Sequence, residues 1–69
     1  MSNQLPTIAK NIRKLRKEKE LSQDRLSKMA DVSYNSIMKI ESGAIQSPGI
    51  DIVQKIAKAL GVSVDKLIS

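Results

Sequence analysis

Apolar side chains recur at helical spacing from the start of the chain, where Ile8, Ile12 and Leu15 define one face of a helix. At about 100° per residue, the basic side chains of the same segment fall on the opposite side. These are Lys10, Arg13, Lys14 and Lys17. The pattern predicts an amphipathic first helix that begins at Pro6 and Thr7, without a capping box because no Glu or Gln follows three residues after Thr7.

A second helix is predicted after Ser22, because a serine hydroxyl can accept a hydrogen bond from the free N–H groups of a helix start. Asp24 stands in its first turn, where the helix dipole favours negative charge. Leu26, Met29 and Ala30 then form the expected inward stripe.

A tight turn at Asp31-Val32-Ser33 leads into a third helix over about residues 34–42. Ser33 can cap this helix, and Gly43 can adopt the left-handed conformation that ends it. Residues 22–43 therefore read as two short helices joined by a tight turn.

Two more helices complete the pattern. After a connection over residues 44–49, in which Ser47 or Gly49 could provide a cap, a strongly periodic fourth helix ends at Gly61. Its apolar positions are Ile52, Val53, Ile56, Ala57 and Leu60. Ser63 then begins a short fifth helix that carries Leu67 and Ile68.

Length and composition indicate one all-α domain over residues 1–69, with 41% hydrophobic residues for one small core. A second, catalytic domain has no room. The core of a domain this small supplies no more than about 3–5 kcal/mol, and no cysteine is available for a disulfide. We therefore expect a compact five-helix bundle stabilised by local packing, aided in some settings by dimerisation.

The residue types in the chain exclude several classes of function. Without Cys or His, the chain lacks the usual transition-metal ligands and nucleophile pairs, and its carboxylates stand singly, so we expect no enzyme, metal, cofactor or small-molecule ligand. No apolar run approaches the roughly 20 residues that cross a bilayer. The segment Met1-Ser2-Asn3-Gln4 lacks the charged-then-apolar order of a signal peptide, so a soluble cytoplasmic protein is expected.

The charge balance favours a polyanionic partner, because 12 Lys and Arg residues face 7 Asp and Glu and leave a net charge of +5. Half of these cations lie in or just after the first helix, at Lys10, Arg13, Lys14, Arg16, Lys17 and Lys19. They could contact the partner, or they could be a solvated face that adds only to the long-range field. Tyr34 is the single aromatic residue, so base-stacking platforms are missing and double-stranded DNA is favoured over RNA.

The outer face of the third helix carries the chemistry that reads base edges. Ile37 and Ile40 point inward on a helical wheel, with Tyr34 at the flank of the first turn. The opposite face presents Asn35, Met38, Lys39 and Ser42. Asn can bond adenine, Lys can bond guanine or a phosphate, and Met or Tyr carbon atoms can touch thymine methyl groups. The alternative is that this face is simply the solvated side of a packed helix.

Two further positions suggest roles around this face. Gln23 follows the cap of the second helix, where its amide could clamp a phosphate beside the free N–H groups or could simply be solvated. Arg16 lies on the flank between the apolar stripe and the basic face of the first helix. We expect it to form an ion pair with Glu41 that locks the first helix to the third.

Taken together, these residues resemble the Cro/repressor-type, XRE-like helix-turn-helix family of phage repressors and bacterial regulators. The resemblance covers nearly the whole chain, and its pieces occur in order and at the family's intervals. They are Ile12-Arg13-Lys14-Leu15-Arg16, Leu21-Ser22-Gln23, Ile37, Ile40-Glu41-Ser42-Gly43, Pro48 and Ile56-Ala57-Lys58-Ala59-Leu60-Gly61-Val62-Ser63. The resemblance implies the lambda-repressor-like five-helix bundle.

The resemblance also implies roles for individual residues. It assigns base contacts to Tyr34, Asn35 and Lys39, with Ser36 at the edge of the groove, and phosphate contacts to Ser22, Gln23, Ser42, Gln46 and Ser47. The Arg16 and Glu41 positions carry a structural ion pair in many relatives. Several relatives have Gln or Arg where this chain has Tyr34 and Lys39, so their operators do not carry over, and the loop over residues 44–46 lacks the cations that some relatives have there.

The leading interpretation is a sequence-specific transcriptional regulator that binds a pseudo-palindromic operator as a homodimer. Two copies of the third helix would then lie about 34–36 Å apart, one turn of the duplex. The expected dimer surface is Val62, Val64, Leu67 and Ile68, although these residues could instead only close the bundle. The alternative interpretation is an antitoxin or adaptor whose main partner is another protein. Many relatives carry a second domain, so we expect either a complete small regulator or the DNA-binding piece of a longer protein.

Overall fold

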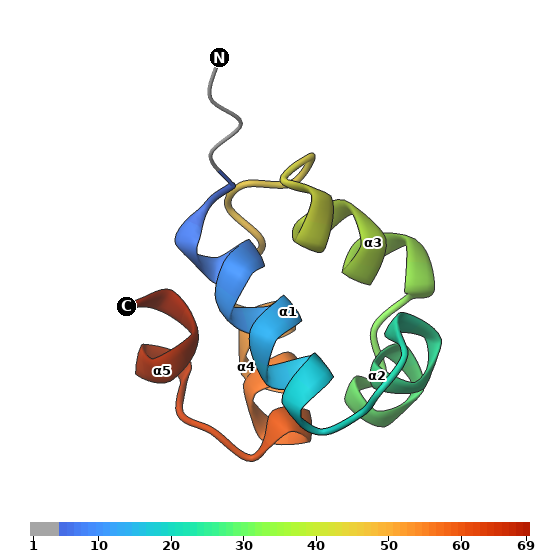
Figure 1. Cartoon of the computed structure of the whole chain (residues 1–69). Helices are drawn as coiled ribbons and strands as arrows, with labels where there is room; N and C mark the ends of the chain where they lie inside the picture. Colours follow the sequence, from blue (N-terminus) through green and yellow to red (C-terminus); the bar gives the residue numbers. More distant parts are fainter. Residues whose placement is uncertain (1–4) are drawn as a thin grey trace.

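The computed structural model describes residues 5–69 and folds them into five α-helices, with no strand in that range (Figure 1). The helices are α1 (Thr7–Glu18), α2 (Gln23–Ala30), α3 (Tyr34–Ser42), α4 (Ile50–Leu60) and α5 (Val64–Ile68). The expected all-α, five-helix fold is confirmed. The inference drawn from Met1-Ser2-Asn3-Gln4, and the first four residues of the expected domain, lie outside the described residues. Within the described part, none of the helices has the length and apolar character needed to span a bilayer.

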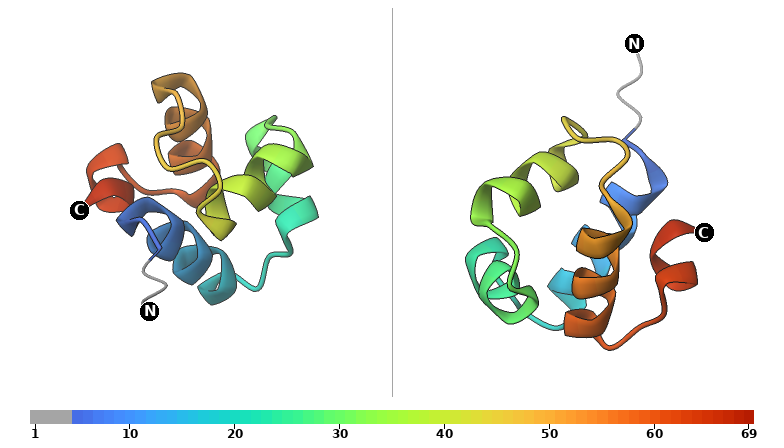
Figure 2. Two further views of the ribbon diagram at one scale, coloured as in Figure 1. Left: turned by 90° about the horizontal axis from the view of Figure 1, so that it is seen from above. Right: turned by 180° about the vertical axis from the view of Figure 1, so that it is seen from behind.

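Helix α1 lies at the centre of the bundle and packs against α3, α4 and α5. Helix α2 packs against α3 and α4, and α4 also packs against α5. In the three views of Figures 1 and 2, α3 and α5 lie on opposite sides of the pair formed by α1 and α4. One side of the bundle therefore belongs to the helix-turn-helix segment and the other to the C-terminal helix.

The core draws side chains from all five helices. The large ones that are fully buried are Ile12, Leu26, Ile37, Ile40, Ile56, Leu60 and Leu67. The prediction that Met29 points inward on α2 was wrong, since 46% of its surface is exposed. The side of α2 that faces the core is centred on Ala30, which leaves Met29 outside it. Ser27 takes the buried place instead, and its Oγ donates to the Asp24 carbonyl at 2.6 Å. A small residue that satisfies its own hydroxyl can be buried there without an unpaired polar group.

Three serines cap helices as predicted. Ser22, Ser33 and Ser63 each accept a hydrogen bond at Oγ from the backbone N–H three residues ahead, at 2.9, 3.1 and 3.1 Å. Helices α1 and α4 begin after Pro6 and Gly49 without a side-chain cap. Of the two residues expected to cap α4, the glycine therefore occupies that position. These caps fix where α2, α3 and α5 begin.

Asn11 ties the C-terminal helix to α1, a contact that no sequence pattern predicts. Its Nδ2 lies 2.8 Å from the Leu67 carbonyl oxygen, with the carbonyl oxygens of Lys66 and Ser69 at 3.3 and 3.1 Å. The carbonyl groups at a helix end have no partner within the helix. The Asn11 amide supplies one across 55 to 58 positions of sequence, and so helps a five-residue helix to dock.

The turn between α2 and α3 contains a strained residue, Asp31, whose φ of 58° lies in the left-handed region that favours glycine. Its carboxylate also stands at the negative end of the α2 dipole. We expect Asp31→Gly to stabilise the fold by about 0.5–1 kcal/mol and to raise the melting temperature by about 2–8 °C. Thermal unfolding followed by circular dichroism measures the shift. Asp31→Ala is the control, since it removes the charge but keeps the Cβ atom, and equal gains from both variants would contradict the backbone explanation.

Candidate nucleic-acid interface

The outward face of α3 is exposed as the sequence predicted. Ile37 and Ile40 are buried against the core, whereas Asn35, Met38, Lys39 and Ser42 are exposed. Tyr34, in the first turn, exposes 44% of its surface. An amide, an ammonium, a thioether, a hydroxyl and a phenol therefore lie on one open side of a single nine-residue helix.

Ser36 differs from its neighbours because it is half-buried and already engaged. Its Oγ accepts a hydrogen bond from the Ser33 hydroxyl at 2.8 Å, and its backbone N–H donates to the same hydroxyl at 3.1 Å. The side chain therefore belongs to the cap of α3 as well as to the edge of the exposed face. The chemically open part of the first turn is formed by Tyr34 and Asn35.

A buried ion pair fixes α3 to the rest of the bundle. Arg16 on α1 donates to Glu41 on α3 through two nitrogens, with Nε 2.7 Å from Oε2 and Nη2 3.0 Å from Oε1. Its Nη1 also donates to the Leu21 carbonyl at 2.7 Å. The two side chains expose only 11% and 4% of their surfaces. The pair expected between these residues is thus a bidentate, largely buried contact that joins α1, the α1–α2 turn and α3.

The electrostatics of this pair favour a permanent charge on Arg16. Hydrogen bonds to Glu41 and the attraction of its carboxylate raise the pKa of Arg16 above its ordinary value, against the opposing effect of burial. A raised pKa in the folded state means that this contribution to stability is lost only in strongly alkaline solution. The arginine side of the link therefore stays charged except in strongly alkaline solution.

Gln23, the first residue of α2, joins the same network. Its Nε2 donates to Glu41 Oε1 at 3.1 Å, so its amide is held by a carboxylate on α3 as well as by its place at the start of α2. In the described structure, no buried side-chain nitrogen or oxygen is left without a hydrogen-bond partner. Helices α1, α2 and α3 therefore meet at one satisfied polar cluster beneath the exposed face of α3.

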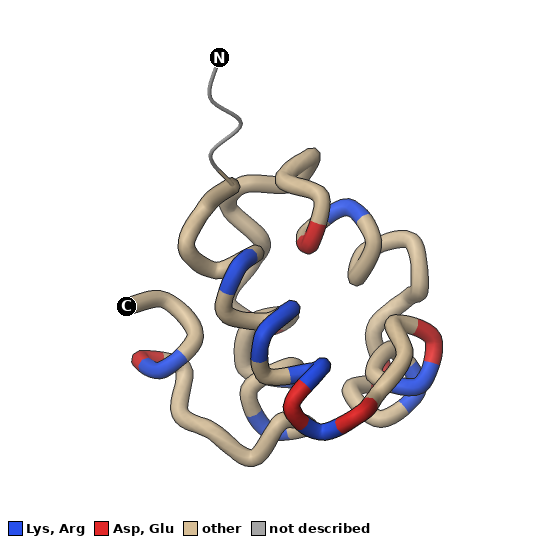
Figure 3. Tube along the Cα trace, viewed as in Figure 1, with Lys and Arg blue, Asp and Glu red and all other residues tan. Residues whose placement is uncertain are grey.

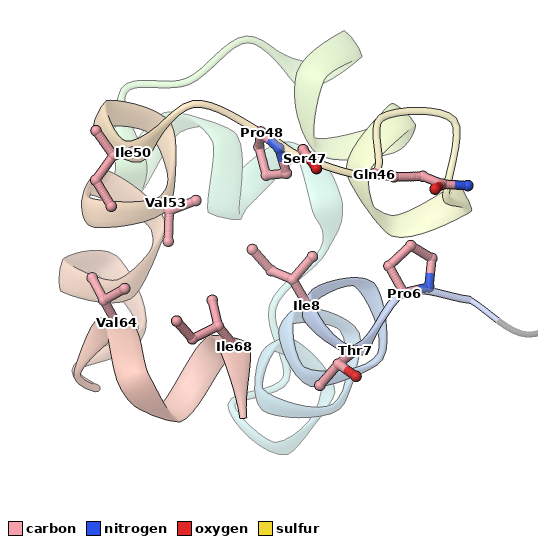
Figure 4. A pocket seen from close by; sticks show the side chains of 10 residues that line it. All are labelled: Pro6, Thr7, Ile8, Gln46, Ser47, Pro48, Ile50, Val53, Val64 and Ile68. Atoms are coloured by element: carbon pink, nitrogen blue, oxygen red, sulfur yellow. The ribbon is translucent and has the colours of Figure 1, made fainter.

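The five residues expected to contact phosphate lie in two places. Gln23 and Ser42 line the same small hollow, and Ser22 directly precedes Gln23. Gln46 and Ser47 lie in the loop before α4, at the mouth of a different, mainly apolar groove (Figure 4). The hydroxyls of Ser22 and Ser42 are engaged within their own helix ends, by the Arg25 N–H and by the Lys39 carbonyl.

Basic positions follow α1 along its length, and basic and acidic positions alternate in the turn after it (Figure 3). In α2, Lys28 and Asp24 form an exposed pair at 3.3 Å, which contributes little to stability. The excess of positive charge is therefore found on α1, and α3 adds one more cation at Lys39.

The expected dimer surface needs correction. Leu67 is fully buried and cannot reach a second molecule, because it is the one residue of α5 that fills the core. Val62 and Val64 are half-buried against that core, whereas Ile68 exposes 52% of its surface. Ile50 exposes 60% of its surface and was not predicted to be part of this surface. The one sequence feature that could have indicated its exposure is its place at the first position of α4, outside the apolar stripe.

These exposed side chains border an open apolar groove of about 390 Å³ between α1, α4 and α5. Figure 4 shows Ile8, Val53, Val64 and Ile68 around this groove, with Ile50 at the start of α4. The lining of the groove comes from the start of α1, the loop before α4, α4 itself and α5, and includes no residue of α3.

Comparison with protein families finds a match to the helix-turn-helix family model over residues 12–67. The chain is 36% identical over 62 residues to the cryptic phage CTXphi transcriptional repressor RstR of Vibrio cholerae. This match covers 90% of the chain but 55% of that repressor, so the chain spans about half the length of this relative.

Solved structures show the same fold. The N-terminal DNA-binding domain of SinR from Bacillus subtilis matches with a TM-score of 0.89 and 32% identity, over 91% of each chain. The restriction-modification controller protein C.AhdI from Aeromonas hydrophila matches with a TM-score of 0.82, over 88% of this chain and 91% of that one. At 24% identity the second likeness bears on the fold alone.

Proposed function

The chain belongs to the helix-turn-helix family, whose members are DNA-binding transcriptional regulators and not enzymes. We propose that it regulates transcription by placing α3 in the major groove of double-stranded DNA. The observation that carries the proposal is the exposed polar face of α3, held at a fixed angle by the buried Arg16–Glu41 pair. A helix that contacts bases needs an exposed face and a fixed orientation in the domain. The likeness to SinR supports the same use of this fold, because the matching part of SinR is a DNA-binding domain.

In this proposal the base contacts come from Tyr34, Asn35 and Lys39, with Ser36 at the groove edge. The Asn35 amide has the donor and acceptor that match the adenine edge, and the Lys39 ammonium can donate to guanine. The carbon atoms of Tyr34 can touch a thymine methyl group. Their exposure along one side of α3 supports these roles, whereas the engaged hydroxyl of Ser36 limits it to a marginal contact.

The phosphate contacts in this proposal come from Ser22, Gln23, Ser42, Gln46 and Ser47. The first two stand at the start of α2, where free N–H groups and the helix dipole favour an anion. Such contacts set the register and orientation of a protein on the duplex, while base contacts provide the discrimination.

We further propose that two copies bind together on a pseudo-palindromic operator. The supporting observation is the α4 and α5 side of the apolar groove, with Ile50, Val64 and Ile68, a surface that a second copy can cover in a symmetric contact. Gln46 lies on the other side of the groove and stays free for the duplex (Figure 4). Because α5 and α3 lie on opposite sides of α1 and α4, a contact through α5 leaves both reading helices open.

Ile68→Asp tests this surface. We expect the dimer dissociation constant to rise at least about tenfold, because a charge replaces an apolar side chain twice in a symmetric contact. Sedimentation equilibrium of the purified chain measures it, and the melting temperature of the monomer should change little because Ile68 is exposed. Met29→Asp is the matched control, since Met29 is similarly exposed but lies on α2, away from the groove. A wild type that stays monomeric at all concentrations and binds DNA as a single copy would overturn the dimer.

The proposed function as a whole is tested by selecting bound duplexes from a random pool. The most enriched duplex is then titrated with the protein at two salt concentrations. We expect a motif with two related halves, and a binding constant whose logarithm falls steeply with the logarithm of salt concentration. If no duplex is enriched, or if affinity barely responds to salt, DNA is not the partner and an antitoxin-like or adaptor role with a protein partner replaces the proposal.

A further inference from the structure

A small hollow of about 190 Å³ opens where α1, α2 and α3 meet, directly above the buried polar cluster. Its lining residues are Arg13, Arg16, Gln23, Met38, Glu41 and Ser42. It is large enough for several waters, or for a phosphate group that keeps part of its hydration. Five of the six lining side chains are polar or charged, which distinguishes this hollow from the apolar groove beside α5.

The charges around the hollow sum to one positive charge. Glu41 is the one acid among the lining residues, and its carboxylate is occupied by two nitrogens of Arg16 and by the Gln23 amide. This pairing offsets the repulsion that an unpaired carboxylate would exert on an anion. Arg13, which is exposed on α1, then supplies the net charge.

The contact with Glu41 also sets the direction of the Gln23 amide. A carboxylate only accepts hydrogen bonds, so the NH₂ end of the amide must face Glu41 Oε1, 3.1 Å away. An amide NH₂ group carries two hydrogens, and only one of them is needed for that contact. The other gives the hollow a donor in addition to the guanidinium of Arg13.

The hollow is continuous with the exposed face of α3, because Met38 belongs to both. A duplex that receives α3 in its major groove must bring one of its two backbones past this edge of the helix. The other cations of α1 are placed differently. Lys14, for example, lines a separate hollow with Asn11 and Lys66 on the side toward α5.

We propose that this hollow seats one phosphate of the DNA backbone, with Arg13 as its cationic ligand and the Gln23 amide as a second donor oriented by Glu41. The inference rests on the proposed function and assigns Arg13 a contact that separates it from the solvated cations of α1. Arginine suits this place because its planar guanidinium can bond two phosphate oxygens at once.

The test uses the selected duplex with single backbone phosphates replaced, one position at a time, by uncharged methylphosphonate. Against the unmodified duplex, Arg13→Gln should bind about tenfold more weakly and reduce the slope of log affinity against log salt by about one for each bound protomer. At one backbone position in each half-site, the modification should weaken wild-type binding by a similar factor and leave Arg13→Gln almost unchanged. This loss of additivity at one position identifies the partner of Arg13.

Lys14→Gln is the matched control, because it removes the same charge from the same helix outside the hollow. Its effect should stay additive with every methylphosphonate. Additive effects of Arg13→Gln at all positions would overturn the phosphate seat while leaving the proposed function intact, whereas a wild type that binds no duplex would overturn the proposed function itself. A shift of the Gln23 side-chain NH₂ signals with inorganic phosphate alone, without coupling on DNA, would reassign the hollow to free phosphate and also overturn the proposal.

Discussion

Arg16→Met is expected to destabilise the fold by about 3–5 kcal/mol, because it leaves the Glu41 carboxylate buried without its charged partner. Glu41 exposes only 4% of its side chain, so water replaces the two lost hydrogen bonds poorly. A core of this size supplies no more than about 3–5 kcal/mol in all, and the variant should therefore be largely unfolded at room temperature. Urea unfolding followed by circular dichroism measures the loss.

The double variant Arg16→Met with Glu41→Leu separates the unpaired charge from the lost packing. Replacing both partners with apolar side chains removes the buried charge, so most of the stability should return. Recovery will be incomplete, since the Leu21 carbonyl and the Gln23 amide also lose a partner. If the free energy of unfolding of the single variant stays within about 1 kcal/mol of the wild-type value, the pair does not fix the orientation of α3.

Asn35→Ala is expected to weaken binding to the selected operator by about 2–6 kcal/mol, because a bidentate amide–adenine contact contributes about 1–3 kcal/mol of discrimination and a dimer makes it twice. Binding to random duplexes should stay nearly unchanged, since that binding depends on phosphates. Competition titrations with the operator and with a shuffled duplex of the same composition measure both values.

Two further variants serve as comparisons for Asn35→Ala. Gln54→Ala removes an exposed amide from α4, outside the proposed interface, and should leave both affinities unchanged. Gln23→Ala should weaken the operator and the random duplex alike, as expected for a phosphate contact. Equal losses on all sequences from Asn35→Ala would remove Asn35 from base reading and place it among the phosphate contacts.

The helices could be predicted from the sequence because their ends carry explicit signals. Ser22, Ser33 and Ser63 cap three starts, and Gly43 and Gly61 end two helices in the left-handed conformation. The exposed face of α3 followed from the helical period once Ile37 and Ile40 were placed inward. The pairing of Arg16 with Glu41 followed from the flank position of the arginine and from the family resemblance.

Other features depend on how the helices cross, which periodicity does not report. Met29 and Ser27 exchange their expected places because the angle of α2 centres its buried side on Ala30. In α5, five residues leave room for one fully buried side chain, and only the packed structure decides that it is Leu67 and not Ile68.

Glu20, which follows the C-cap of α1, and Asp31, the C-cap of α2, have positive φ at 57° and 58°, although neither is a glycine. Local sequence therefore gave no signal of these two left-handed residues. The contact of Asn11 with the end of α5 spans too much sequence for any local pattern to reveal.

The central claim is that α3, and not the apolar side of the bundle, meets the duplex. Backbone amide chemical shifts of the isotope-labelled chain, followed by NMR during titration with the selected operator, test it most directly. We expect the largest changes on residues 34–39, with further changes at Arg13 and Gln23. Changes confined to the surface of Ile50, Val64 and Ile68, with α3 unaffected, would contradict it.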